Sequence, residues 1–173
     1  TKMTPGRLLQ HLLAWEQRVR QVYVTLSQRQ QFPAALRAVW QALADDEMHH
    51  VVALERSAHL FSVMVAAPSI SDRTLDEVEA TVVAAETAVQ HPHITSDEPF
   101  RQALSLEESQ LNRIDAAWLH GFGSTTSLLL HTQLPQMLQH IGRLVDAVHQ
   151  FSTDDALSAR ADSPQRRDPT SGG

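Results

Sequence analysis

Apolar residues recur along most of this chain at alternating spacings of three and four, which places their side chains on one face of an α-helix. The first such stretch covers residues 8–26 and follows Thr4-Pro5, which is typical of an N-cap with proline at the first helical position. Phe32-Pro33 interrupts the pattern, so a first helix should end before these residues. Its apolar stripe consists of Leu8, Leu12, Trp15, Val19, Val22 and Leu26.

A second helix is expected from about residue 33 to residue 66. At about 100° per residue, Glu47 and His50 fall near the centre of its apolar stripe, so both side chains should point into the protein. An ionised carboxylate on a buried helix face is unfavourable unless a partner compensates its charge. The stripe itself consists of Leu36, Trp40, Leu43, Leu54 and Phe61.

The following segment reads as a connection that carries a helix of its own. Pro68-Ser69 ends the second helix, and Thr74-Leu75-Asp76-Glu77 has the capping-box pattern of a helix start. The amphipathic pattern after it continues to about Val89. Residues 67–98 are therefore expected to form a crossover, long enough to return the chain along the far side of a helical bundle.

Another helix should begin at Thr95-Ser96-Asp97-Glu98, which again has capping-box spacing, and end at Gly121-Phe122-Gly123. Glu107 occupies a core position of its seam, and Glu108 lies on the shoulder. A modest rotation of the helix would exchange the two, so both are candidates for an inward-facing carboxylate. The seam consists of Phe100, Leu104, Glu107, Leu111, Ile114 and Trp118.

A last helix should follow Ser124 and run to about residue 150. Pro135 should kink this helix or mark a late start, because proline removes a helical hydrogen bond. Residues 152–173 are polar, so we expect one helical domain over residues 1–151 and a disordered tail over 152–173. The last stripe consists of Leu130, Leu134, Met137, Ile141, Leu144 and Val148.

Composition narrows the function classes. The chain has 173 residues, and its formal net charge of -6 argues against a general nucleic-acid-binding protein. The absence of Cys excludes disulfide scaffolds, iron–sulfur clusters and thiolate catalysis. No apolar run approaches the roughly 20 residues that cross a bilayer, and no signal-peptide segment precedes the first helix, so we expect a cytoplasmic protein with no membrane partner.

Two glutamates, Glu47 and Glu16, indicate a metal site. Glu47 and His50 form a Glu-x-x-His pair, which a carboxylate-bridged di-metal site takes from one helix of a four-helix bundle. The same pair could instead be a buried polar contact that fixes the helix register. Glu16 shares one shoulder of the first stripe with Tyr23, where it is either a ligand or the ion-pair partner of Arg20.

These features, in this order, resemble the ferritin-like superfamily and its rubrerythrin branch in particular. In that family the first helix carries a ligand Glu followed seven residues later by Tyr, as Glu16 and Tyr23 are placed here. The second helix carries Glu-x-x-His, which Glu47 and His50 match. The third helix opens with an Ala-x-x-x-Glu segment, which residues 103–107 resemble.

The resemblance covers residues 8–150 and departs from the family pattern on the fourth helix. A second Glu-x-x-His is expected there, but the matching segment ends at His140 with Met137 three residues before it. Met137 therefore removes one of the two bridging carboxylates of the family. His140 lies about 60° off the Met137 stripe, so it is either a ligand or a hydrogen-bonded, partly buried histidine.

The resemblance implies an all-α, ferritin-like four-helix bundle with a long crossover carrying an extra short helix, as a homodimer or larger homo-oligomer. It also implies a non-haem iron site, with Mn or Zn as other metals for such ligands, that oxidises Fe(II) with oxygen or peroxide as a ferroxidase or peroxidase. Glu47 would bridge two metal ions, Glu16 and Glu107 would each bind one, and Tyr23 would lie behind the ligands. No catalytic residue is implied beyond the ligands.

Three alternatives remain open. The loss of a bridging carboxylate at Met137 leaves room for a mononuclear site at Glu16, Glu47 and His50. Met137 and Pro135 also fit a bundle that has lost its metal and works as a binding or assembly module. An enzyme that uses the carboxylate–histidine pair without metal has little support, because no nucleophile is placed beside it.

Overall fold

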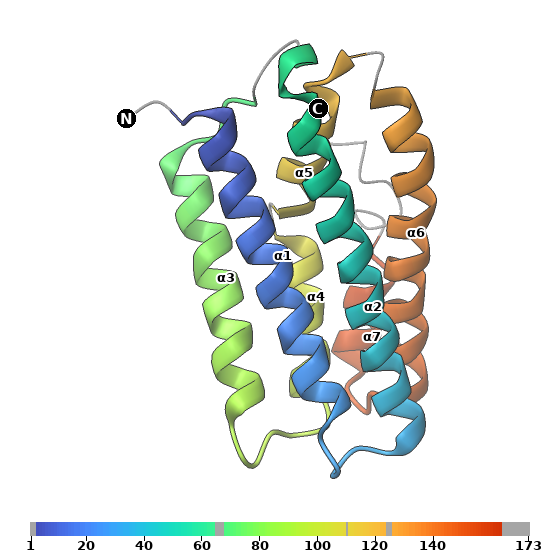
Figure 1. The fold of residues 1–173 in the computed structure, drawn as a ribbon. Coiled ribbons are helices and arrows are strands. Elements are labelled where there is room, and N and C mark those ends of the chain that lie inside the picture. The colour runs from blue at the N-terminus through green and yellow to red at the C-terminus, as the bar shows by residue number, and fades with distance from the viewer. Residues whose placement is uncertain (1–2, 65–67, 110, 124–125, 164–173) are drawn as a thin grey trace.

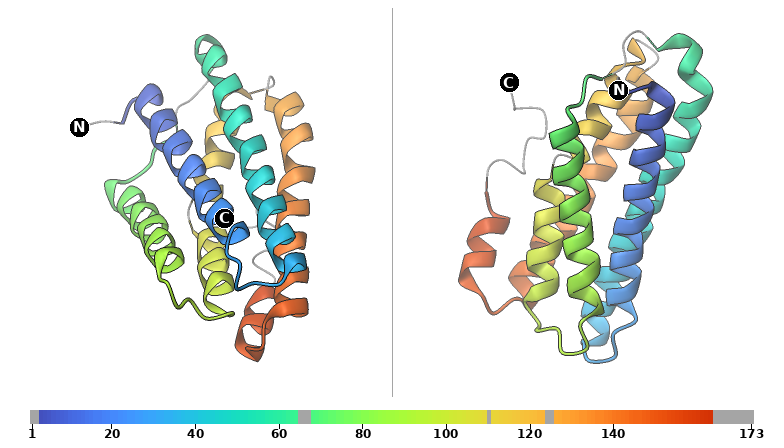
Figure 2. Two further views of the ribbon diagram at one scale, coloured as in Figure 1. Left: turned by 60° about the horizontal axis from the view of Figure 1, so that its bottom comes forward. Right: turned by 90° about the vertical axis from the view of Figure 1, so that its left-hand side faces the viewer.

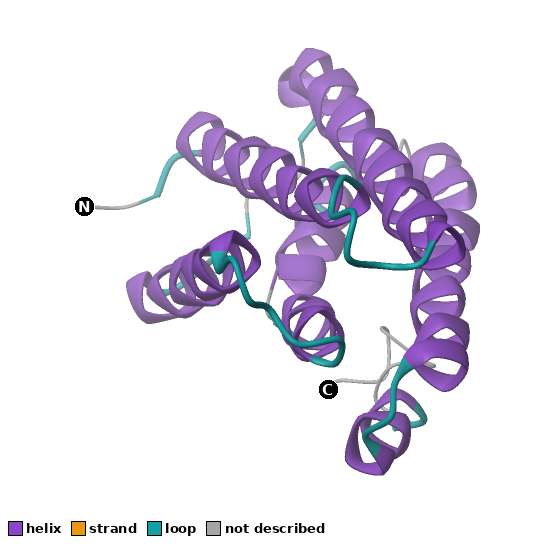
Figure 3. Cartoon of the chain, turned by 90° about the horizontal axis from the view of Figure 1, so that it is seen from below, coloured by secondary structure: helices purple, strands orange, loops and turns teal. Residues whose placement is uncertain are grey.

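The computed structural model describes residues 3–64, 68–109, 111–123 and 126–163, and the side chains of these residues except 61–63, 119 and 126–134. The predicted stripe positions Phe61, Leu130 and Leu134 lie outside the described side chains. In the described residues all regular elements are helices and no strand occurs (Figure 3). The all-α fold class is thus confirmed.

The first two helices form the most extensive pair in the structure. α1 (Pro5–Ser27) and α2 (Ala34–Ser57) run antiparallel beside one another (Figure 1). The Thr4 hydroxyl accepts a hydrogen bond of 3.3 Å from the N–H of Arg7, so the predicted cap is present.

The predicted end of the second helix near residue 66 is wrong, because α2 ends at Ser57 and a 3-10 helix, η1 (Ala58–Val63), follows. The Ser57 hydroxyl donates to the carbonyl of Leu54 at 2.6 Å and accepts from the Trp118 indole N–H at 2.8 Å. A hydrogen bond from a side chain to a nearby carbonyl competes with the backbone hydrogen bonds of the helix. The spacing of apolar residues gives no indication of such a bond.

The crossover carries the expected helix, α3 (Asp72–Gln90), which packs against α1 and α4 (Figure 2). It begins earlier than predicted, because the hydroxyl of Ser71, rather than that of Thr74, caps it by accepting the Thr74 N–H at 3.1 Å. Arg18 of α1 donates to Glu79 and Glu86 of α3 at 2.7–2.8 Å. These ion pairs hold α3 against the outer face of α1.

The helix predicted between residues 98 and 120 is broken in two, as α4 (Glu98–Glu108) and α5 (Leu111–His120). Ser109 adopts an extended conformation with ψ 166°, and its hydroxyl accepts the Leu111 N–H at 3.3 Å. The apolar seam continues across this break, since residues on both sides of it are buried. They are Phe100, Leu104, Leu111, Ile114 and Trp118.

The last long helix is α6 (Thr126–Phe151), which packs against α2 and contains Pro135 on its exposed side. The helix therefore does not start late at this proline. The elements α1, α2, α4–α5 and α6 run side by side, with α3 outside α1 and α4 (Figures 1 and 2). This arrangement brings mid-helix positions far apart in the sequence to one level. None of the described helices is long and apolar enough to cross a bilayer.

The expectation of a disordered tail over 152–173 is wrong for its first part, where residues Asp155–Ala161 form α7. The Asp154 carboxylate accepts the Ala156 N–H at 2.9 Å and caps this helix. Leu157 and Ala161 are buried in the main core. One cap and one apolar pair four residues apart thus order a segment whose composition is polar, whereas residues 164–173 lie outside the described part.

Replacing Leu157 with alanine should lower the free energy of unfolding by about 2–4 kcal/mol, because a buried leucine leaves a cavity. Leu138→Ala is the matched control, since Leu138 is 44% exposed on α6 and Leu157 is 3% exposed. The control should change the value by less than about 0.5 kcal/mol. Urea unfolding followed by circular dichroism measures both, and equal effects would contradict the packing of α7 into the core.

Candidate metal centre

The residues predicted to be metal ligands lie together in the interior, although they come from four different helices. α1 supplies Glu16, α2 supplies Glu47 and His50, α4 supplies Glu107, and α6 supplies His140. Three of them are no more than 3% exposed, and the side chains of His50 and Glu107 are 11% and 7% exposed. The structure therefore brings all the predicted ligands into one buried cluster.

Glu16, Glu47 and His50 form one side of this cluster. Their ligand atoms all lie within 4.8 Å of one another. His50 Nδ1 is 3.0 Å from Glu47 Oε2 and 3.6 Å from Glu16 Oε2. Glu16 thus faces His50 across the α1–α2 interface, and its predicted alternative role as the ion-pair partner of Arg20 is not what the geometry shows.

Glu107 and His140 form the other side, together with the same Glu47. These three also have ligand atoms within 4.8 Å of one another. His140 Nε2 lies 2.8 Å from Glu107 Oε1 and 3.3 Å from Glu47 Oε1. His140 is only 2% exposed, so its position off the Met137 stripe does not keep it from the core.

Glu47 belongs to both sides, and its two oxygens are divided between them. Oε2 faces His50, whereas Oε1 faces His140. A carboxylate that presents one oxygen to each of two neighbouring groups of ligands has the arrangement of a bridging ligand.

A further group of side chains lies behind the ligands and fixes their orientation. The Tyr23 hydroxyl donates to Glu107 Oε1 at 3.4 Å, and Asn112 Nδ2 donates to Glu107 Oε2 at 3.1 Å. Asp46 Oδ2 is 3.4 Å from His140 Nδ1 and 3.2 Å from Arg143 Nε. With Nδ1 directed at a carboxylate, the other ring nitrogen of His140 is the one available as a ligand. The hydroxyl of Tyr23, which the resemblance places behind the ligands, thus contacts Glu107.

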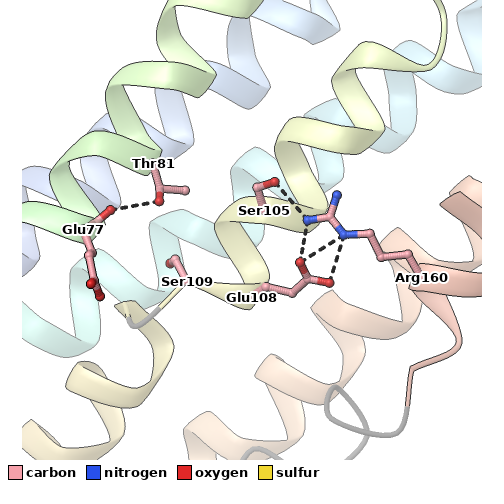
Figure 4. A pocket seen from close by; sticks show the side chains of 6 residues that line it. All are labelled: Glu77, Thr81, Ser105, Glu108, Ser109 and Arg160. Atoms are coloured by element: carbon pink, nitrogen blue, oxygen red, sulfur yellow. Dashed lines mark hydrogen bonds and ion pairs between the residues drawn. The ribbon is translucent and has the colours of Figure 1, made fainter. Parts of the chain in front are cut away.

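The buried face of α4 decides between Glu107 and Glu108, because Glu107 lies four residues after buried Ala103 and three after buried Leu104. Glu107 points into the cluster, whereas Glu108 points outward and accepts hydrogen bonds of 3.0–3.1 Å from Arg160 Nε of α7 (Figure 4). This ion pair lines a surface pocket of about 320 Å³ between α3, α4 and α7. The pocket is polar and separate from the buried cluster, and it is lined by Glu77, Thr81, Ser105, Glu108, Ser109 and Arg160.

Sequence reasoning missed Asp115 of α5. Its Oδ1 is shielded from solvent, and the nearby charge of Glu16 raises the pKa of its carboxyl. A signal was available, since Asp115 lies four residues after Leu111 and three before Trp118, beside two seam positions. Asp46 was also missed, although it lies three residues after Leu43 and four before His50, beside two stripe positions of the second helix.

The ionisable groups of the cluster lie close together away from water, so each changes the pKa of its neighbours. Burial and the charge of Glu16 raise the pKa of Glu47 to about 7. Burial would raise the pKa of Glu16 as well, but hydrogen bonds with His50 and Asp115 outweigh it and lower that pKa to about 2. Burial and the Glu16 charge raise the pKa of Asp115 well above its usual range. The cluster thus resists holding all its carboxylates ionised together.

For the two histidines, the surroundings favour the charged form. Burial would lower the pKa of His140, but the charges of Glu107 and Glu47 and the contact with Asp46 raise it to about 10. Burial would likewise lower the pKa of His50, and the charge of Glu47 reverses this and raises it well above its usual range. Imidazolium groups therefore supply the positive charge that the carboxylates need when nothing else does.

The donor set suits divalent transition metals, because carboxylate and imidazole ligands bind Fe, Mn and Zn. The buried carboxyl groups of Glu16, Glu47 and Glu107 and the partly exposed Asp115 near them carry four negative charges when ionised. Two divalent ions would balance that charge and leave both imidazoles neutral, which is the form that binds metal. The residues present therefore fit a pair of metal ions.

No family model matches this chain, and neither a curated protein nor a solved structure matches it. The resemblance to the ferritin-like superfamily therefore stays a prediction. What the buried cluster does has to be inferred from its geometry and charge.

In the metal-free protein, Glu47→Gln should raise the free energy of unfolding at pH 8 by about 1–3 kcal/mol. The pKa of Glu47 is raised to about 7 on folding. Protonated Glu47 therefore stabilises the folded state fully below its usual pKa, and this stabilisation is lost as the pH rises through 7. The gain should therefore vanish near pH 4.

Chemical unfolding between pH 4 and pH 9 after chelator treatment and dialysis measures this difference. Glu55→Gln, at an exposed position of the same helix, is the control and should give no pH-dependent gain. A Glu47→Gln protein that is less stable than the parent at pH 8 would contradict the strained, charged state of Glu47.

Proposed function

We propose that the buried cluster binds two divalent metal ions, iron in the first place, and that the protein oxidises Fe(II) with oxygen or peroxide. The single observation that carries this proposal is the pair of ligand groups that share Glu47. Mn and Zn are the other metals that the donor set would accept. The ferritin-like bundle and the homodimer that the sequence resemblance implies belong to the same proposal.

Each side of the cluster offers one imidazole and one carboxylate of its own in addition to Glu47. His50 with Glu16 serves one side, and His140 with Glu107 serves the other. Their convergence is supported by helices that are held in place independently, since Arg18 ties α1 to α3 and Trp118 ties α5 to Ser57. A site built on packed helices keeps its geometry better than one built on loops.

Bound iron would supply reversible one-electron chemistry with oxygen or peroxide at its open coordination positions. The chain's own part is to hold the ligands and to control charge around them. The Tyr23 hydroxyl donates a hydrogen bond of 3.4 Å to Glu107 Oε1. Tyr23 is fully buried, with its ring 6.0 Å from that of Trp40 and nearly parallel to it. Asp46 pairs with His140 from the outer side, and Arg143 in turn pairs with Asp46.

One observation favours a second function, a metal-free bundle that serves as a binding or assembly module. The cluster can compensate its own charge, because His50 pairs with Glu47 at 3.0 Å and His140 pairs with Glu107 at 2.8 Å. Such a network could act only to fix the register of the helices. Metal binding separates the two functions.

Protein purified without chelator should contain metal, and an anaerobic Fe(II) titration should reach two ions per chain. Glu47→Ala should lose at least about 90% of this binding at the same free Fe(II) concentration, because it removes a ligand common to both sides. Admitting air should then convert bound Fe(II) to Fe(III), seen as a rise in near-ultraviolet absorbance, faster in the parent than in Glu47→Ala.

Glu108→Ala is the matched control, since Glu108 neighbours Glu107 in sequence but faces Arg160. It should bind as much iron as the parent protein. If the parent and Glu47→Ala bound equally little iron, the metal proposal would fail and the assembly function would stand. Tight binding with no acceleration of Fe(II) oxidation would refute the oxidase function alone.

A further inference from the structure

The two oxygens of Glu107 lie in different surroundings. Oε1 is 2.8 Å from His140 Nε2 and accepts a hydrogen bond of 3.4 Å from the Tyr23 hydroxyl. Oε2 accepts a hydrogen bond of 3.1 Å from Asn112 Nδ2. Glu47 differs, because each of its oxygens faces an imidazole. Glu107 therefore presents one oxygen to the cluster, while an amide holds the other.

Asn112 reaches Glu107 because the helix breaks between them. Residues five apart in a continuous α-helix lie about 140° apart around its axis, so their side chains do not face each other. Here α4 ends at Glu108, Ser109 is extended with ψ 166°, and α5 begins at Leu111. The side chain of Asn112, the second residue of α5, is thus directed back to the end of α4.

A second hydrogen bond fixes the direction of the Asn112 amide. Its Nδ2 also donates to the backbone carbonyl of Glu107 at 3.3 Å. The last four carbonyls of an α-helix have no partner within the helix, so this bond satisfies one of them. An amide NH2 group has two hydrogens and can make both bonds at once. The amide is therefore anchored on the backbone of α4 while it holds Oε2.

This arrangement limits how Glu107 can bind an ion. A carboxylate binds a divalent ion through one oxygen or through both. Oε2 would have to leave Asn112 before it could bind. The ligand atoms that remain on this side are Oε1 of Glu107, Oε1 of Glu47 and Nε2 of His140, and Nε2 is 2.8 and 3.3 Å from the two oxygens. Metal–ligand bonds of about 2.0–2.2 Å put neighbouring ligand atoms roughly 3 Å apart, so the three atoms are spaced as ligands of one ion.

We propose that Asn112 is a positioning residue that limits Glu107 to one metal-binding oxygen, Oε1. This inference rests on the proposed function and deepens it. The ion beside His140 then has three protein ligand atoms and an open coordination position, which is the arrangement of a metal that binds water or a substrate. Oxygen, peroxide or a small anion binds this ion at the position that Oε2 would otherwise fill.

Titration with Co(II) at pH 7.5 tests this inference, because the visible absorption of Co(II) weakens as its coordination number rises. The parent should bind two Co(II) ions, and His140→Ala should lose the ion on its side, which assigns the two spectra. Asn112→Leu keeps the size of the side chain and removes both hydrogen-bond donors. It should still bind two ions, with weaker absorption only for the ion beside His140, because Oε2 becomes an additional ligand.

Azide measures the open position directly. It should bind the Co(II) ion beside His140 in the parent and change the spectrum of that ion. In Asn112→Leu the affinity for azide should fall about tenfold, because Oε2 occupies the position that azide needs. Thr4→Ala is the control, since it removes a helix cap at the start of α1. It should lower stability, as the loss of a cap does, and leave both spectra and the azide affinity unchanged.

An Asn112→Leu protein with the spectra and azide affinity of the parent would overturn the role of Asn112 and leave the proposed function standing. Loss of the ion beside His140 in Asn112→Leu would also overturn the inference, because the amide would then be needed for Glu107 to bind at all. Absence of tight Co(II) and Fe(II) binding in the parent itself would overturn both the inference and the proposed function.

Discussion

The burial of several carboxylates around Glu47 is the constraint on which the interior depends. An uncompensated carboxylate inside a protein is unfavourable by several kcal/mol. Among the described side chains, Glu16, Glu47 and Glu107 lie within reach of two imidazoles, those of His50 and His140. The raised pKa of Glu47 favours its neutral form, and the raised pKa of His140 favours its positively charged form. Both changes reduce the unbalanced negative charge in the core. A pair of divalent ions would remove that strain.

The surrounding fold serves this cluster by fixing each helix from outside it. Arg18 ties α1 to α3 through Glu79 and Glu86, and α7 packs against the core through Leu157. The break at Ser109 matters most, because it divides the third long element into α4 and α5. The first half, α4, then contributes Glu107 to the cluster.

Apolar spacing was sufficient to predict the all-α fold, the crossover helix and the inward direction of Glu47 and His50. For Glu16, on the shoulder of its stripe, it left open a ligand or an ion-pair partner of Arg20. It could not predict the end of α2 or the break in α4–α5, because both depend on hydroxyl groups of Ser57 and Ser109 that bond locally. Asp115 was missed although it lies beside two seam positions, because a single carboxylate beside a seam is ordinary on a helix.

The central claim is that Glu47 lies between two metal ions. Crystals grown with excess Fe(II) under anaerobic conditions and measured on both sides of the iron absorption edge test it most directly. The account predicts two anomalous peaks about 3–4 Å apart, one beside His50 and one beside His140, with Glu47 between them. A map with no peak in the cluster, and Glu47 still paired with the two imidazoles, would contradict it.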